Sequence, residues 1–186
     1  MRKRFMLAGS LLAMVTGALA LPAASLAASA LVTGTVSGTT LSLATSATPT
    51  FSANLDLGDA TPTYTAALNV QDTRGTGVGW NTTITSTQFT TGGATPQTLA
   101  TNASSLTGVT SACASGTCTN PTNAVSYPIA VPAGATAPTA VKFFNAAANT
   151  GMGKFTATPT IGVFVPQNSF SGAYTSTLTL AVVTGP

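Results

Sequence analysis

The sequence predicts an all-β protein: an antiparallel β-sandwich, Ig-like or Greek-key, with little helix. Threonine and valine are abundant, and charged residues make up only 5% of the 186 residues. Branched side chains suit a pleated sheet and lose freedom in a helix, whose usual formers Glu, Lys and Arg are scarce here. Apolar and polar residues also alternate in many short segments separated by Pro, Gly and Asn, a pattern typical of sandwiches.

Four segments alternate strongly enough to predict strands: 62–71, 80–89, 155–165 and 174–183. Each places apolar side chains on one face and mostly threonines on the other. Weaker strand candidates are 31–36, 39–44, 50–55, 126–131 and 139–144. We expect one helical turn within 144–153, and a long connection with at most one short strand over 92–116.

The N-terminal residues have the pattern of a secretory signal peptide. Arg2, Lys3 and Arg4 precede an apolar stretch at 5–21, and small residues then offer cleavage after Ala27 or Ala30. The alternative is an uncleaved anchor, but glycines and hydroxyl residues interrupt the apolar stretch. We therefore expect a signal peptide at 1–27 and a single sandwich domain at 28–186, exported to the cell surface or cell wall, with no membrane attachment after removal of the signal.

The scarcity of charge excludes most enzyme chemistry. The chain has no histidine, and its three acidic residues are Asp56, Asp59 and Asp72. Neither a histidine-activated nucleophile nor a zinc site can be assembled from this set. Once the N-terminal cluster is set aside, the basic and acidic residues balance, which predicts no nucleic-acid partner. We expect no catalytic residue, no metal and no cofactor.

Two short sequences remain as candidates for local roles. Asp56 and Asp59 flank Leu-Gly, which favours a turn, with a calcium site as the less favoured alternative. Cys113 and Cys118 are the only cysteines, and an even count in an exported chain predicts a disulfide between them. A redox-active pair is the alternative, but its usual two-residue spacing is absent.

The segment 70–82 holds the only tryptophan and an Asp-x-Arg-Gly sequence. Asp72, Arg74 and Gly75 lie in a glycine-rich connection that leads through Gly79 into Trp80 at the start of a predicted strand. Three glycines at alternate positions predict a loop between two strands. An ion pair between the aspartate and the arginine would hold that loop in one conformation.

This segment resembles the first motif of the WxL domain, a C-terminal cell-surface domain of wall-associated proteins of Gram-positive bacteria. The family's second motif, Tyr-x-x-x-Leu-Thr near the C-terminus, is matched by Tyr174, Leu178 and Thr179. The resemblance covers roughly residues 30–185, with Thr82 standing where the first motif has leucine. It implies non-covalent attachment to the cell wall through peptidoglycan. Other surface proteins are a second class of candidate partner.

Alternation places both motif aromatics, Trp80 and Tyr174, on the apolar face of their strands, which predicts core residues rather than sugar-stacking platforms. Thr82 puts a hydroxyl on the same face as Trp80, and this hydroxyl needs a backbone partner or a place at the rim of the sandwich. We therefore expect Trp80 to be partly buried near one end of the sandwich. The solvent-facing surface would then be rows of threonines, whose hydroxyls could bind glycan. These rows are Thr83, Thr85 and Thr87; Thr156, Thr158 and Thr160; and Thr175, Thr177 and Thr179. The leading function is a non-catalytic cell-wall-binding domain. The alternative is a subunit of a surface filament or coat that assembles through β-strand edges.

Overall fold

The computed structural model describes residues 31–186, so the expected signal peptide lies outside the described residues. The chain divides into two units, 1–35 and 36–186. In the first, the described residues 31–35 are exposed and have no regular structure. The strand expected at 31–36 is therefore wrong: Leu31 and Val36 are 92% and 99% exposed. The alternation is present, but a strand also needs a neighbour, and no described residue pairs with this segment.

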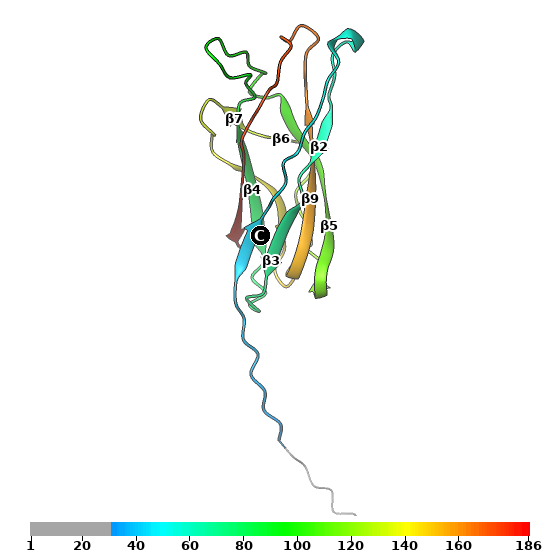
Figure 1. Ribbon diagram of the computed structural model, residues 1–186. Helices are drawn as coiled ribbons and strands as arrows, with labels where there is room; N and C mark the ends of the chain where they lie inside the picture. Colours follow the sequence, from blue (N-terminus) through cyan, green and yellow to red (C-terminus); the bar gives the residue numbers. More distant parts are fainter. Residues whose placement is uncertain (1–30) are drawn as a thin grey trace, which may run out of the picture. The chain divides into compact units, whose positions relative to one another are not determined.

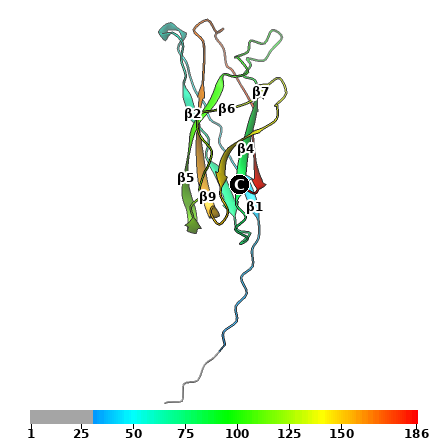
Figure 2. The same cartoon turned by 180° about the vertical axis from the view of Figure 1, so that it is seen from behind.

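The second unit contains two β-sheets. The larger sheet has the order β1-β3-β9-β5-β6, and β2 also pairs with β9. Its pairs are antiparallel throughout. Figure 2 shows β1 and β5 toward opposite borders of this sheet. Its strands are β1 (Leu41–Ala44), β2 (Thr63–Thr65), β3 (Leu68–Asp72), β5 (Ser104–Thr119), β6 (Ile129–Ala130) and β9 (Met152–Val163).

The smaller sheet is built around β4 (Trp80–Thr87), which pairs with both β10 (Leu178–Thr184) and β8 (Val141–Ala146). These pairs are antiparallel, and the short β7 (Ala133–Gly134) runs parallel to the end of β4. The two sheets pack face to face, as Figure 1 shows, so the predicted sandwich is confirmed. The one helical element in the described residues is the 3-10 turn η1 (Leu55–Leu57).

No helix within residues 31–186 has the length and apolar character needed to cross a membrane.

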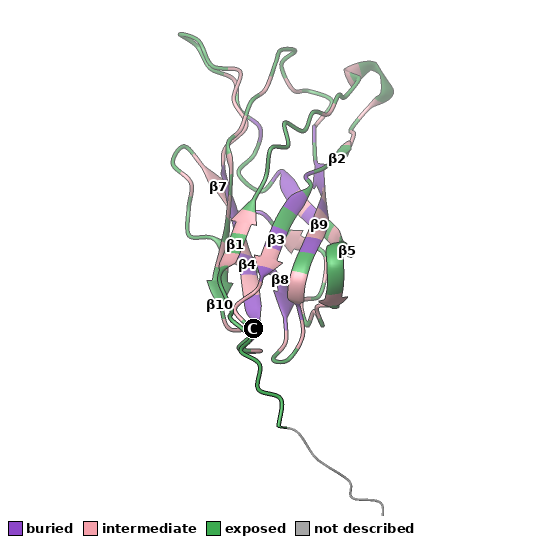
Figure 3. Ribbon diagram, turned by 60° about the horizontal axis from the view of Figure 1, so that its bottom comes forward, coloured by how far each residue is buried: buried purple, intermediate pink, exposed green. Residues whose placement is uncertain are grey.

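Burial follows the predicted alternation in the central strands. In β3, Leu68 and Val70 are buried while Asn69 between them is exposed. In β9, Phe155 and Ala157 are buried while Thr156 is only partly covered. Figure 3 shows this change of burial class along both strands. The apolar side chains of the two sheets thus meet in the space between them, as the period of two requires.

Trp80 lies in the main core, as predicted. It is fully buried, and its ring meets Phe144 edge-on, with the ring centroids 5.6 Å apart. Its indole Nε1 donates a hydrogen bond of 2.9 Å to the carbonyl of Gly151, so its polar atom is satisfied. Gly151 has φ of 67°, and a side chain there would collide with the indole. The expectation that Trp80 would be only partly buried, at the rim, is wrong.

Three expectations about local structure are also wrong. Residues 92–116 do not form a mere connection, because β5 is 16 residues long. Its Ser, Gly and Ala give almost no hydrophobic signal; it is a strand because the backbone of β9 pairs with it. Residues 50–55 form no strand, and η1 begins after an Asn54 cap. No helical turn forms over 144–153, where β8 ends and the chain reverses near Asn149, which has φ of 63°.

The predicted disulfide between Cys113 and Cys118 is present, with a Cα–Cα distance of 5.8 Å. It closes an irregular part of β5, where the pairing register with β9 shifts and Gly116 has φ of 69°. The bridge therefore fixes a bulge at an exposed sheet edge. Bulges of this kind make an edge less able to pair with another strand.

Removal of the Trp80 ring tests its place in the core. We expect Trp80→Ala to lower the free energy of unfolding by about 3–5 kcal/mol, because a large buried ring and its hydrogen bond are lost together. Urea denaturation measures this value. Phe164→Ala is the matched control, since that ring is 44% exposed and its loss should cost far less. Equal losses in the two variants would contradict the placement.

Candidate functional site

The residues of the first motif form an ion-paired clamp in the loop between β3 and β4. Asp72 is 2% exposed at the end of β3, and its two carboxylate oxygens accept hydrogen bonds from Nε and Nη2 of Arg74, both at 2.9 Å. The backbone N–H of Arg74 also donates to Asp72 Oδ1 at 3.2 Å. This bidentate geometry fixes the arginine in one orientation.

The fixed arginine then connects two distant parts of the chain. Its Nη2 donates to the carbonyl of Gly79 at 2.8 Å, and its Nη1 donates to Thr184 Oγ1, also at 2.8 Å. The loop before Trp80 is thereby tied to the last residue of β10. Gly79 has φ of 74°, and a Cβ there would meet the carbonyl oxygen of Ala146. The clamp thus needs glycine at this position.

Gly75 also has a positive φ, 70°, but a side chain there would meet no neighbouring atom. Its role is therefore confined to the turn, where a residue with a Cβ is strained at such a φ.

The clamp sets the ionisation of Asp72. Burial alone would raise the pKa of this carboxyl, but the side-chain and backbone hydrogen bonds from Arg74 and its positive charge outweigh it, so the pKa is lowered. The same pairing raises the pKa of Arg74. Both groups stay charged at neutral pH and are already engaged with each other, which makes Asp72 a structural anion rather than a general acid or base.

Thr82, which departs from the family's leucine, is accommodated inside the sandwich. Its side chain is 1% exposed, and its hydroxyl donates to the carbonyl of Phe144 at 3.2 Å. The pairing of β4 with β8 shifts register beside this residue. The hydroxyl has the backbone partner that the sequence required, so the departure leaves no unsatisfied polar group in the core.

The second motif lies at the other end of β4. Leu178 pairs with Ser86 and Thr179 with Thr85, whereas Trp80 pairs with Thr184. The six residue steps from Trp80 to Ser86 separate the two motifs by about 20 Å of strand. The structure therefore does not bring the two motifs together into one site.

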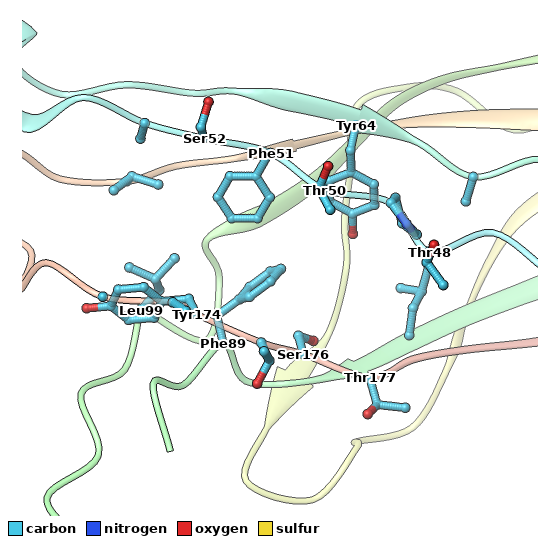
Figure 4. Close-up of a pocket in the computed structure, with 18 of the residues that line it drawn as sticks. Thr48, Thr50, Phe51, Ser52, Tyr64, Phe89, Leu99, Tyr174, Ser176 and Thr177 are labelled. Atoms are coloured by element: carbon cyan, nitrogen blue, oxygen red, sulfur yellow. The ribbon is translucent and has the colours of Figure 1, made fainter. Parts of the chain in front are cut away.

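Tyr174 and Leu178 line a groove between the border segments of the two sheets. Thr48–Ser52 lies along one side and Tyr174–Thr177 along the other, with the rings of Phe51, Tyr64 and Phe89 between them (Figure 4). We call this hollow, of about 830 Å³, the aromatic groove. Tyr174 is half-buried, as its alternation predicted, and its hydroxyl donates to the carbonyl of Phe170 at 2.9 Å.

The aromatic groove has an apolar floor and no charge. The ring of Phe51 stacks on Tyr64 at 6.2 Å between centroids and meets Phe89 edge-on at 5.4 Å. Burial raises the pKa of Tyr64 to about 12, so its hydroxyl stays protonated. None of the lining residues is charged, and the polar side chains among them are those of serine, threonine and two tyrosines. Sequence reasoning missed Phe51 and Phe89, because the chain around Phe51 alternates weakly and belongs to no strand.

The three predicted rows of threonines differ in how far the structure exposes them to solvent. Thr85 is buried, and its hydroxyl donates to the carbonyls of Pro132 and Pro138, so it is not part of the surface. Thr83 and Thr87 are partly covered, and Thr87 Oγ1 accepts the N–H of Thr177. Thr175, Thr177 and Thr179 are exposed. The row Thr156, Thr158 and Thr160 points outward from β9 in the middle of the larger sheet.

Strand register extends the β9 row into a wider polar surface, because directly opposed residues of neighbouring strands share a face. We call it the hydroxyl face. Its charged member is Lys154, beside Gln71, and it carries no acidic side chain. The neutral polar residues of the hydroxyl face are Ser42, Thr63, Thr65, Asn69, Gln71, Ser105, Thr110, Ser115, Thr156, Thr158 and Thr160.

Asp56 and Asp59 lie in a turn. Asp56 is in the first turn of η1 after the Asn54 cap, and Asp59 Oδ1 accepts the backbone N–H of Gln167 at 2.8 Å. No group of three potential metal-binding side chains occurs among residues 31–186.

The lowered pKa of Asp72 gives a test of the clamp. Its ionised form is favoured in the folded state, so its stabilisation is present above about pH 4, the unfolded pKa, and is lost as pH falls through the lower folded pKa. We expect Asp72→Asn to lose about 3 kcal/mol at pH 7, because it leaves Arg74 without its buried partner. The difference from wild type should shrink in acid. Denaturation at several pH values measures it, with the exposed Asp56→Asn as control; a difference independent of pH would contradict the assignment.

Comparison with known proteins agrees with the resemblance that the two motifs indicate. The family model for the WxL domain, described as a surface cell wall-binding domain, matches residues 15–186. No curated protein and no solved structure matches the chain. The match covers nearly all of the chain, including both motifs. The chain therefore belongs to the WxL family of surface domains that bind the cell wall.

Proposed function

We propose that this domain binds peptidoglycan non-covalently, without catalysing a reaction, through the hydroxyl face. In this proposal the chain reaches the wall by export on a signal peptide at residues 1–27. We choose this surface because of its composition. It presents hydroxyl and amide groups on adjoining strands and no carboxylate. Neighbouring strands are about 4.8 Å apart, so these groups form a regular array of donors and acceptors.

The chemistry of the ligand fits this array. A glycan backbone offers hydroxyl and acetamido groups, which exchange hydrogen bonds with threonine, asparagine and glutamine side chains. A face without carboxylates also avoids repulsion by the anionic polymers of a cell wall. Each such hydrogen bond contributes about 1 kcal/mol, so several must act together, as a face spanning β1, β3, β9 and β5 allows.

The state of the acidic residues supports the absence of catalysis. Asp72 is held by Arg74, and Asp59 accepts the N–H of Gln167. Hydrolysis of a glycan uses two carboxyl groups that face each other across the scissile bond. The sequence holds one further acid, Asp56, in an exposed turn. The expected role is therefore attachment, not cleavage.

Isosteric substitution tests the hydroxyl face. We expect Thr156→Val combined with Thr158→Val to weaken binding to purified peptidoglycan about tenfold or more, because two hydrogen bonds of about 1 kcal/mol each are lost. Valine keeps the shape and strand preference of threonine, so folding is preserved. Thr179→Val, on the exposed outer face of the smaller sheet, is the matched control. Co-sedimentation with peptidoglycan stripped of anionic polymers measures the affinity.

Three results would overturn the proposal. One is loss of binding when the anionic polymers are removed, and another is equal weakening in the control variant. The third is release of soluble sugar from the wall by the wild-type protein. Binding to stripped peptidoglycan should also survive an ionic strength of about 1 M, where charge attraction is screened over about 3 Å.

A further inference from the structure

We propose that the aromatic groove receives the segment 31–36 of a second copy of this chain, which adds as a strand to the wall of the groove. The inference goes beyond wall attachment, because it assigns the protein a way to assemble with itself. We call residues 31–36 the donor segment. Two features of the described residues lie behind it: an apolar groove of about 830 Å³, and an exposed apolar segment that pairs with none of the residues 37–186.

The walls of the groove favour a polypeptide as the occupant. Residues 48–53 form no backbone hydrogen bond with any other described residue, and the same holds for residues 171–173 on the opposite side. An extended segment lying between these walls could pair with their free N–H and carbonyl groups, as in β-strand addition. The floor offers rings for its side chains, mainly Phe51 and Phe89.

The donor segment has the matching chemistry. Leu31, Val32 and Val36 are 92%, 89% and 99% exposed, an unfavourable state for apolar side chains. Val32, Gly34 and Val36 alternate with Leu31, Thr33 and Thr35, so an extended conformation presents the two valines on one face. Neither the segment nor the groove carries a charged side chain, so no charge is desolvated when they combine.

Chain length requires that the donor come from another copy. Gly38 packs against the carbonyl of Arg74, whereas Phe51 stacks on Tyr64. Ten residue steps, through β2 and β3, separate Tyr64 from Arg74, which is about 33 Å of nearly extended chain. The seven residue steps from Leu31 to Gly38 reach about 25 Å at most. A chain cannot lay its own donor segment across the floor of its own groove.

This contact is heterologous, because each copy offers a donor at one place and an acceptor at another. Such contacts repeat and give rings where the rotation between copies closes, or open chains where it does not, and both form to a greater extent as the concentration rises. We therefore expect the exported protein, processed by the cell that secretes it and containing residues 31–186, to form concentration-dependent oligomers in solution.

Two variants with matched controls test the donor and the acceptor. Val32→Asp with Val36→Asp should weaken self-association at least tenfold, while Thr33→Asp with Thr35→Asp places the same charges on the other face and should have little effect. Ala173→Arg, on the exposed wall of the groove, should also weaken it at least tenfold. Ala181→Arg, exposed on β10 away from the groove, is its control. Sedimentation velocity measures the size distribution, and thermal melts check that each variant folds.

Mixing the two defective variants gives the decisive measurement. The Val32→Asp/Val36→Asp chain keeps an intact groove, and the Ala173→Arg chain keeps an intact donor segment. We expect each alone to be monomeric and the mixture to form dimers that grow no further. A monomeric wild-type protein at about 100 μM, oligomers insensitive to either variant, or a mixture that stays monomeric would each overturn the proposal. Wall binding is measured separately and should be unchanged in Ala173→Arg.

Discussion

The salt bridge between Asp72 and Arg74 is the interaction on which the motif end of the sandwich depends. It is the one ion pair in the described part of the chain, and it holds a guanidinium whose other N–H groups reach Gly79 and Thr184. Through these contacts the loop between the sheets and the last strand become a single unit. Arg74 holds the carbonyl of Gly79, and β4 begins at the next residue, Trp80. The fixed loop therefore allows Trp80 to be fully enclosed in the core.

The two sequence motifs of the family therefore act on opposite ends of one strand pair. The first fixes the start of β4 against the end of β10, and the second lies where β10 begins and where the sheets separate around the aromatic groove. The aromatic residues of both motifs are at least half-buried. In the two proposals, the wall contacts the hydroxyl face, which holds no motif residue, and a second copy of the chain contacts the aromatic groove, which Tyr174 and Leu178 of the second motif help to line. These two proposed surfaces are separate, so attachment and assembly need not compete.

Both proposed binding surfaces have very few charged side chains, as does the chain as a whole. With 5% charged residues, the chain depends on backbone pairing, apolar packing and hydroxyl groups. Hydroxyls accept and donate hydrogen bonds without the cost of removing a charge from water, so the same residues can be exposed, as Thr158 is in part, or buried, as Thr82 and Thr85 are. Such a composition suits a surface that contacts a neutral polymer.

The sequence by itself determined the fold class, the inward face of the central strands, the disulfide and the inward orientation of Trp80. Each depends on local alternation or on a short separation along the chain, which a sequence displays directly. Tertiary structure decided the rest: β5 is a strand because β9 pairs with a segment whose own residues give no signal, and 50–55 is not a strand. It also joined Arg74 to Thr184 and Phe51 to Phe89, and it buried Thr85 under the prolines of another segment. Those contacts link residues far apart in the chain, and no period in the sequence records them.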